Sequence, residues 1–93
     1  EGQSDDAFER KVLTSFLDRE GHIKAFPAQD KKFQVLLRHV LKSFESQRKY
    51  TEQEVNEIML LFNEDTASLR RGMIEYHYMA REGGGGAYWR IDE

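Results

Sequence analysis

The sequence REGGGGAYWR, residues 81–90, places four consecutive glycines between two charged residues and a segment with two aromatic rings. A flexible linker, a phosphate-binding loop and a β-hairpin turn would each use such glycines. A linker is disfavoured because AYWRI, residues 87–91, carries too much apolar surface to be left in water. A phosphate-binding loop is disfavoured because no helix start follows the glycines. The stretch therefore predicts a hairpin, whose glycines supply positive backbone torsions.

Size and composition indicate one ordinary folded domain. The chain has 93 residues, of which 39% are hydrophobic and 33% are charged, a balance typical of a globular protein. There is no cysteine, which excludes disulfides and thiolate metal sites. The longest apolar run, IMLLF at residues 58–62, is too short to cross a bilayer, and the acidic N-terminus is unlike a signal peptide. We therefore expect a cytoplasmic protein without membrane contact.

Apolar periodicity predicts four helices in front of the hairpin. Large apolar residues recur at helical spacing over residues 5–19, 29–44, 52–62 and 66–76. Between the first two helices, HIKAFP at residues 22–27 alternates and then meets the chain's single proline, which is typical of a short strand.

Capping residues support these boundaries. Thr51 and Glu54 have the spacing of a capping box, in which each side chain bonds the other residue's backbone amide. Asp65 or Thr66 is expected to cap the last helix. Gly21 suits the left-handed conformation that ends the first helix.

The order of these elements predicts an α+β fold of the winged helix-turn-helix kind, with about four helices, a short strand and a C-terminal hairpin as the wing. We expect a single domain over residues 5–91. It comprises an N-terminal helix and strand at 5–26, a three-helix core at 29–76 and the wing hairpin at 78–91. Residues 1–4 are expected to be disordered.

Charge alternates in blocks along the chain. Residues 30–49 contain six cationic and two anionic side chains, whereas residues 50–65 contain five anionic side chains and no cation, within a net charge of −3. Solvated helix faces are the simplest interpretation. Paired blocks of opposite charge also suit self-association or docking on a partner regulator.

Several stretches resemble an uncharacterised bacterial family, the domain of unknown function 2087. The most specific are RKYTEQEVNEI at residues 48–58, DTASLRRGMIEYHYMAREGGGGAYWR at 65–90, and FPA at 26–28. The resemblance covers about residues 16–90. It implies a lone domain, or one that follows a separate DNA-binding helix-turn-helix in transcriptional regulators, with no established chemistry. His77 stands where the family usually has glycine, and histidine tolerates the left-handed conformation less well.

Direct binding to double-stranded DNA is one functional hypothesis. The exposed face of the helix over 66–76 would then enter the major groove, and the hairpin would contact phosphates. The candidate residues are Ser68, Arg70 and Arg71 on the helix, with Arg81 and Arg90 flanking the glycine turn. Against this hypothesis stand Glu52 and Glu54, which lie where the preceding helix would approach the DNA backbone.

A protein-interaction or dimerisation module with a role in transcription regulation is the rival hypothesis, and the one that the sequence favours. The chain carries more aromatic surface than a minimal winged helix needs, and aromatic rings are preferred anchors at interfaces. The candidate anchors are Phe8, Tyr78, Tyr88 and Trp89, and the expected partner is a second copy or a regulator protein. These rings would otherwise complete the core of a small domain.

Enzymatic activity is not expected. His22, His39 and His77 are scattered, without metal-ligand spacing or a partner arrangement that would mark a nucleophile. No metal site or cofactor is predicted. Small-molecule sensing between the first helix and the core stays open, but no residue pattern names a ligand.

Overall fold

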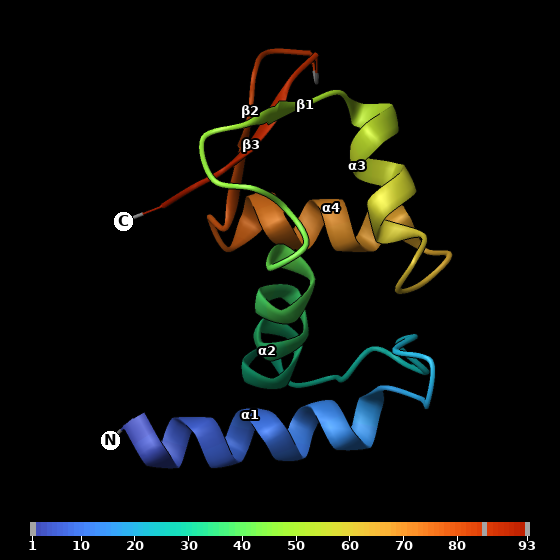
Figure 1. The fold of residues 1–93 in the computed structure, drawn as a ribbon, viewed down its shortest axis with the longest axis vertical. Helices are drawn as coiled ribbons and strands as arrows, with labels where there is room; N and C mark the ends of the chain where they lie inside the picture. The colour runs from blue at the N-terminus through green and yellow to red at the C-terminus, as the bar shows by residue number, and fades with distance from the viewer. Residues whose placement is uncertain (1, 85, 93) are drawn as a thin grey trace.

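The computed structural model describes residues 2–84 and 86–92. Over these residues it is an α+β fold with four helices and a small antiparallel sheet that contains the predicted C-terminal hairpin. The elements are α1 (Gly2–Phe16), α2 (Asp30–Leu41), β1 (Lys49–Tyr50), α3 (Glu52–Met59), α4 (Thr66–Glu75), β2 (Met79–Arg81) and β3 (Tyr88–Arg90). Figure 1 shows α1 at one end of the long axis and the sheet at the other, with α2 and α4 between them.

The predicted hairpin is confirmed. Strands β2 and β3 pair antiparallel, with Arg81 opposite Tyr88. The backbone N–H of Glu82 donates to the carbonyl of Ala87 at 2.9 Å and closes the loop, and Gly83 has a φ of +36°. Such a torsion is easy only for glycine, which explains part of the glycine run.

The sheet contains a third strand that was not predicted. Strand β1 pairs antiparallel with β3, so the order across the sheet is β1-β3-β2. Lys49 lies opposite Trp89, and Tyr50 lies opposite Tyr88. Two residues are too short to show the alternation by which strands are recognised, so only the pairing with β3 reveals β1.

The strand predicted over residues 22–27 does not form. Ile23 makes an isolated bridge with Leu17, and its N–H donates to the carbonyl of Phe62 at 2.7 Å. The turn before it is stabilised by Asp18, whose carboxylate accepts backbone N–H groups at residues 20 and 22. Gly21 has the predicted left-handed conformation, with φ of +88°, but it lies in the turn after the helix and does not end it, because α1 ends at Phe16.

Helix α1 is shifted relative to its prediction. It runs from Gly2 to Phe16 instead of 5–19, so residues 2–4, expected to be disordered, are helical, and residue 1 lies outside the described residues. No proline interrupts this stretch, and the Asp18 turn ends the helix early. Helix α1 packs against α2, and Figure 1 shows α2 between α1 and α4.

The helix caps predicted at Thr51 and Asp65 are present. The Thr51 hydroxyl accepts from the N–H of Glu54 at 3.1 Å, and the Glu54 carboxylate accepts from the N–H of Thr51 at 2.9 Å. Asp65, one of the two predicted candidates, caps α4. His77, just after α4, takes the left-handed conformation, with φ of +64°. Local capping signals therefore located the starts of α3 and α4.

The C-terminal ends were predicted less accurately. Helix α2 ends at Leu41 and α3 at Met59, each about one turn before its predicted end. The next residues form tighter turns, such as the N–H of Leu61 bonded to the carbonyl of Ile58. Their apolar residues still pack at helix-like spacing, so periodicity overestimates helix length.

The core lies between α2, α4, α3 and the sheet. Leu36 and Leu37 of α2, Leu69 of α4 and Met59 of α3 are fully buried. Gly72 lets α2 and α4 approach closely, because a Cβ there would lie 2.9 Å from Leu37 Cδ1.

Helix α1 is connected to the rest of the protein by a polar network around Arg38. One guanidinium nitrogen donates to Glu9 of α1 at 2.8 Å, and the other donates to the Tyr78 hydroxyl at 2.9 Å. That hydroxyl in turn donates to Gln34 at 3.0 Å. Burial lowers the pKa of Arg38, but its bonds to Glu9 and Tyr78 outweigh burial and raise the pKa overall. Tyr78 thus has a structural role in joining elements.

His39 of α2 makes folding stability depend on pH. Burial and the nearby Lys42 lower the pKa of His39 below 6.5, and its ring packs edge-on against Phe62. As the pH falls through 6.5, His39 therefore becomes protonated in the unfolded chain before it does so in the folded protein, which favours unfolding. We expect the free energy of unfolding to decrease between pH 8 and pH 5, and to decrease less in His39→Gln. Urea titrations of both proteins at the two pH values measure this, and parallel losses would contradict it.

Candidate nucleic-acid interface

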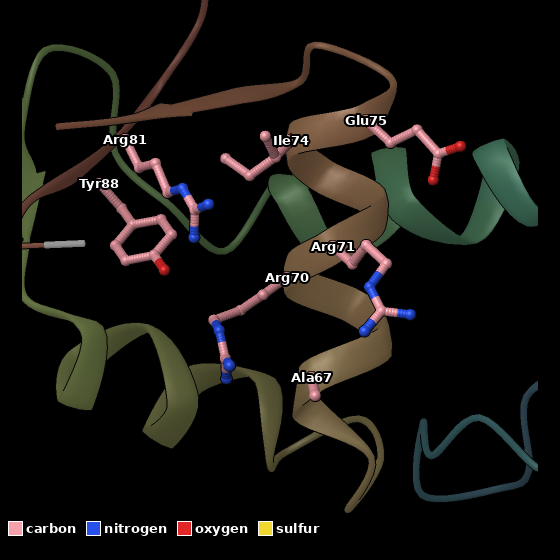
Figure 2. Close-up of a pocket in the computed structure, with 7 residues that line it drawn as sticks. All are labelled: Ala67, Arg70, Arg71, Ile74, Glu75, Arg81 and Tyr88. Atoms are coloured by element: carbon pink, nitrogen blue, oxygen red, sulfur yellow. The ribbon is translucent and has the colours of Figure 1, made fainter. Parts of the chain in front are cut away.

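An open groove of about 520 Å³ lies between α4 and the β2–β3 hairpin. It is lined by Ala67, Arg70, Arg71, Ile74, Glu75, Arg81 and Tyr88 (Figure 2). Three cationic side chains and one anionic side chain therefore line a groove in a chain whose net charge is −3. The groove brings together three of the five residues that the sequence analysis proposed for DNA contact.

Helix α4 presents these residues because its opposite face is buried. Leu69, Gly72 and Met73 pack into the core, which leaves Arg70 and Arg71 on the solvent side. Figure 2 shows Arg71 with Glu75 on one side of α4, and Arg70 on the side that faces the hairpin.

Ser68 belongs to the cap of α4 and is not among the residues that line the groove. Its hydroxyl donates to the Asp65 carboxylate at 2.8 Å, and its N–H donates to the same carboxylate at 3.2 Å. These bonds from the Ser68 side chain and backbone lower the pKa of Asp65. The prediction of Ser68 as a contact residue therefore gains no support from this groove, because its hydroxyl is already engaged.

Arg81 lies at the end of β2 and is exposed. Figure 2 shows its guanidinium directed into the groove, above Tyr88. No salt bridge to Arg81 occurs among residues 7–84 and 86–92, whose side chains the structure describes. Its charge is therefore available to a ligand in the groove.

Arg70 is held between two helices. Its Nη1 donates to Oδ1 of Asn56 on α3 and lies 3.5 Å from the hydroxyl of Thr66 on α4. The side chain is half-buried. Asn56 was not identified as a site residue from the sequence, because nothing local relates it to a residue fourteen positions away.

Arg90 does not join the groove, contrary to the prediction that it flanks the wing as a phosphate clamp. Its Nη1 donates to the carbonyl of Phe44 at 3.0 Å, and its Nε donates to Asp92 at 3.0 Å. The physical reason is the register of the sheet, which places Arg90 opposite Met79, at the other end of β2 from Arg81. Arg90 therefore stabilises the junction of the sheet with the end of α2.

The four predicted interaction anchors do not form one surface. Tyr88 is a core residue with 2% of its surface exposed, which corrects its assignment as an anchor, although its hydroxyl donates to Glu52 at 3.3 Å. Trp89 lies on the opposite face of the sheet, under the amine of Lys49. Phe8 is half-buried on α1, a helix that lies at the opposite end of the molecule from the sheet (Figure 1). Tyr78 belongs to the Arg38 network.

Comparison with known proteins assigns the chain to a family. Residues 22–90 match the family model described as "Uncharacterized protein conserved in bacteria (DUF2087)". The chain belongs to this family. The match includes α2 to α4, the whole sheet and every residue of the groove, whereas α1 lies outside it. No curated protein and no solved structure matches the chain.

A cluster of possible metal ligands lies outside the groove. Asp18, Glu20 and His22 offer ligand atoms within 4.8 Å of one another on the exposed turn after α1, a cluster that the sequence analysis did not predict. The backbone bonds of Asp18 to this turn already account for their proximity. Among residues 2–84 and 86–92, no helix has the length and apolar character needed to span a membrane.

Proposed function

We propose that this domain is a winged helix that contributes to transcription regulation by contacting double-stranded DNA. The element order from α2 to β3 supports the proposal: one helix, a short strand, two helices and a hairpin, with the first strand paired to the last. In this arrangement α4 is the recognition helix and the β2–β3 hairpin is the wing.

The convergence of Arg70, Arg71 and Arg81 on one groove is the observation that carries the proposal. Two arginines come from the candidate recognition helix and one from the candidate wing. A phosphate backbone that follows the groove could contact Arg71 and Arg81 together. The lining of the groove is net cationic, although the net charge of the chain is −3.

Two carboxylates limit the expected affinity. Glu75 lines the groove, and Glu52 accepts a hydrogen bond from the hydroxyl of Tyr88, which also lines it. Like charges near phosphate weaken the electrostatic part of binding. We therefore expect micromolar affinity for a duplex of random sequence at low salt, with a steep loss as the salt concentration rises.

Fluorescence anisotropy of a labelled random duplex tests the proposal directly. The duplex is titrated with the protein at about 50 and about 200 mM salt, because phosphate contacts appear as salt-dependent affinity. Binding at the lower salt that collapses at the higher salt supports contact through the arginines. Absence of binding at the lower salt contradicts DNA contact by this domain alone.

The arginines of the hairpin provide a matched pair of variants. Arg81→Ala should weaken duplex binding about 3- to 10-fold and reduce the salt slope by about one, because one phosphate contact is removed. Arg90→Ala removes an equal charge from the same hairpin but outside the groove, and should leave affinity within about twofold. The same anisotropy titrations compare the two variants. Equal losses would indicate a long-range effect of net charge and would contradict a contact at Arg81.

A protein-interaction role is the second candidate, and the exposed leucines favour it. Leu60 and Leu61, at the end of α3, are 53% and 65% exposed. Adjacent exposed leucines are typical of interaction surfaces. This pair replaces the predicted anchors as the best candidate for contact with a second copy or a regulator. Failure of DNA binding in the anisotropy experiment would favour this role.

A further inference from the structure

The pairing of Arg70 with Asn56 leaves one complete edge of a guanidinium free. Arginine has five N–H donors, and both bonds of Arg70 among the described residues use Nη1. The Nε–H and one N–H of Nη2 point in parallel along the other edge, and neither donates to another described residue. These two donors match a pair of adjacent acceptors.

The guanidinium is also held in place before any ligand arrives. Asn56 lies on α3 and Thr66 lies one turn before Arg70 on α4, so the side chain is oriented from two helices. Fixing a long side chain in advance reduces the conformational entropy lost on binding. A mobile surface arginine that acts only as a point charge would not need this arrangement.

The neighbours of Arg70 favour a base edge over a phosphate as its ligand. Ala67 and Ile74 lie about one turn before and after it, and both line the groove. Small and apolar side chains suit contact with base edges and thymine methyl groups. Arg71 and Arg81 are exposed, whereas Arg70 is half-buried, so Arg71 and Arg81 are the better phosphate contacts.

We propose that Arg70 reads the O6 and N7 atoms of a guanine in the major groove, and that Asn56 is the residue that positions it. The inference rests on the proposed DNA-binding function and adds its sequence specificity. Bidentate contact of arginine with guanine is the commonest specific contact in DNA recognition. The domain should therefore prefer a site in which one position must be a G·C pair.

Selection from a random duplex library with the wild-type protein provides the test sequence. Binding is then measured for the selected duplex and for the same duplex with the required G·C pair changed to A·T. The wild type should discriminate between them by about 5- to 150-fold. Asn56→Ala should lose most of this ratio and keep its affinity for random duplex and its salt slope.

Three further variants separate positioning from a general structural role. Gln53→Ala removes an exposed amide from the same helix, where Gln53 bonds Glu57, and should leave the ratio unchanged. Asn56→Asp keeps the acceptor oxygen and should retain discrimination, although its added charge lowers affinity for every duplex. Arg70→Lys keeps the charge without the paired donors and should lose discrimination. The melting temperature of each variant is measured beside its affinities.

The outcomes distinguish this inference from the proposed function. If no duplex binds the wild type, DNA binding fails and the inference fails with it. If the wild type binds but Asn56→Ala keeps full discrimination at an unchanged melting temperature, only the inference is overturned. If Arg70→Ala weakens binding equally for all sequences and lowers the salt slope by about one, Arg70 contacts phosphate, which also overturns it. If Asn56→Ala does not fold, the inference is tested by the other two variants: it holds if Arg70→Lys loses discrimination while Asn56→Asp retains it, and it fails otherwise.

Discussion

Tyr88→Ala is expected to lower the free energy of unfolding by about 3 to 5 kcal/mol, the range for removing a large buried aromatic ring. Only 2% of Tyr88 is exposed, and it lies in the central strand of the sheet, with Tyr50 opposite on one side and Arg81 on the other. Its loss would leave a cavity where the sheet meets the helices. In a domain of this size, such a loss removes a large part of the total stability.

Urea denaturation of the wild type and the variant measures this change. Trp89→Ala is the matched control, because Trp89 follows Tyr88 on the same strand and points to the opposite, partly exposed face. We expect less than half the Tyr88 effect from Trp89→Ala, although its ring also loses contact with Lys49. If the two substitutions lowered the free energy of unfolding equally, the conclusion that Tyr88 is buried more deeply than Trp89 would be wrong.

Gly72→Val is expected to destabilise the domain by about 1 to 3 kcal/mol through overpacking. A Cβ at this position would lie 2.9 Å from Leu37 Cδ1 and 3.0 Å from Phe33 Cε2. Leu37 is fully buried, so it has little room to move away. The valine methyl groups would therefore force α2 and α4 apart.

Two other substitutions on α4 control for helix propensity. Gly72→Ala adds only the Cβ, and the better helix propensity of alanine, about 1 kcal/mol, offsets part of the crowding. Ala67→Val places the same β-branched side chain on the exposed face and should change stability by less than about 0.7 kcal/mol. Thermal and urea unfolding rank the three variants by stability, and Gly72→Val should be the least stable. A Gly72→Val protein as stable as the wild type would contradict close contact of the two helices.

Some of the fold was predictable because the signals are local. Thr51 and Glu54 form their capping box within four residues of chain, and the capping bonds need no distant partner. The glycine run at 83–86 predicted a hairpin because few other structures use so many glycines next to aromatic residues. Both predictions are confirmed by the backbone of the structure.

Other features were missed because their cause lies far away in the chain. The short strand β1 exists only through its pairing with β3, some forty residues later. HIKAFP alternates like a strand, but Ile23 finds its partners in Leu17 and the carbonyl of Phe62 instead of a sheet. Alternation indicates an extended backbone and does not specify a neighbour.

The candidate site shows the same division. Arg70 and Arg71 could be proposed from helical spacing, since Leu69 and Met73 must turn inward. Arg81 and Arg90 looked equivalent in the sequence, yet one lines the groove and the other bonds the carbonyl of Phe44. Only the strand register, which fixes where each side chain lies along the sheet, separates them.

The sequence by itself determined the starts of α2, α3 and α4, the hairpin and the inward face of α4, because capping, backbone torsion and periodicity act over a few residues. The tertiary structure alone decided that Tyr88 is core, that Arg90 lies outside the groove and that Asn56 holds Arg70. These outcomes depend on contacts between segments far apart in the chain. Such contacts form only when the sheet and helices are packed together, so no local pattern encodes them.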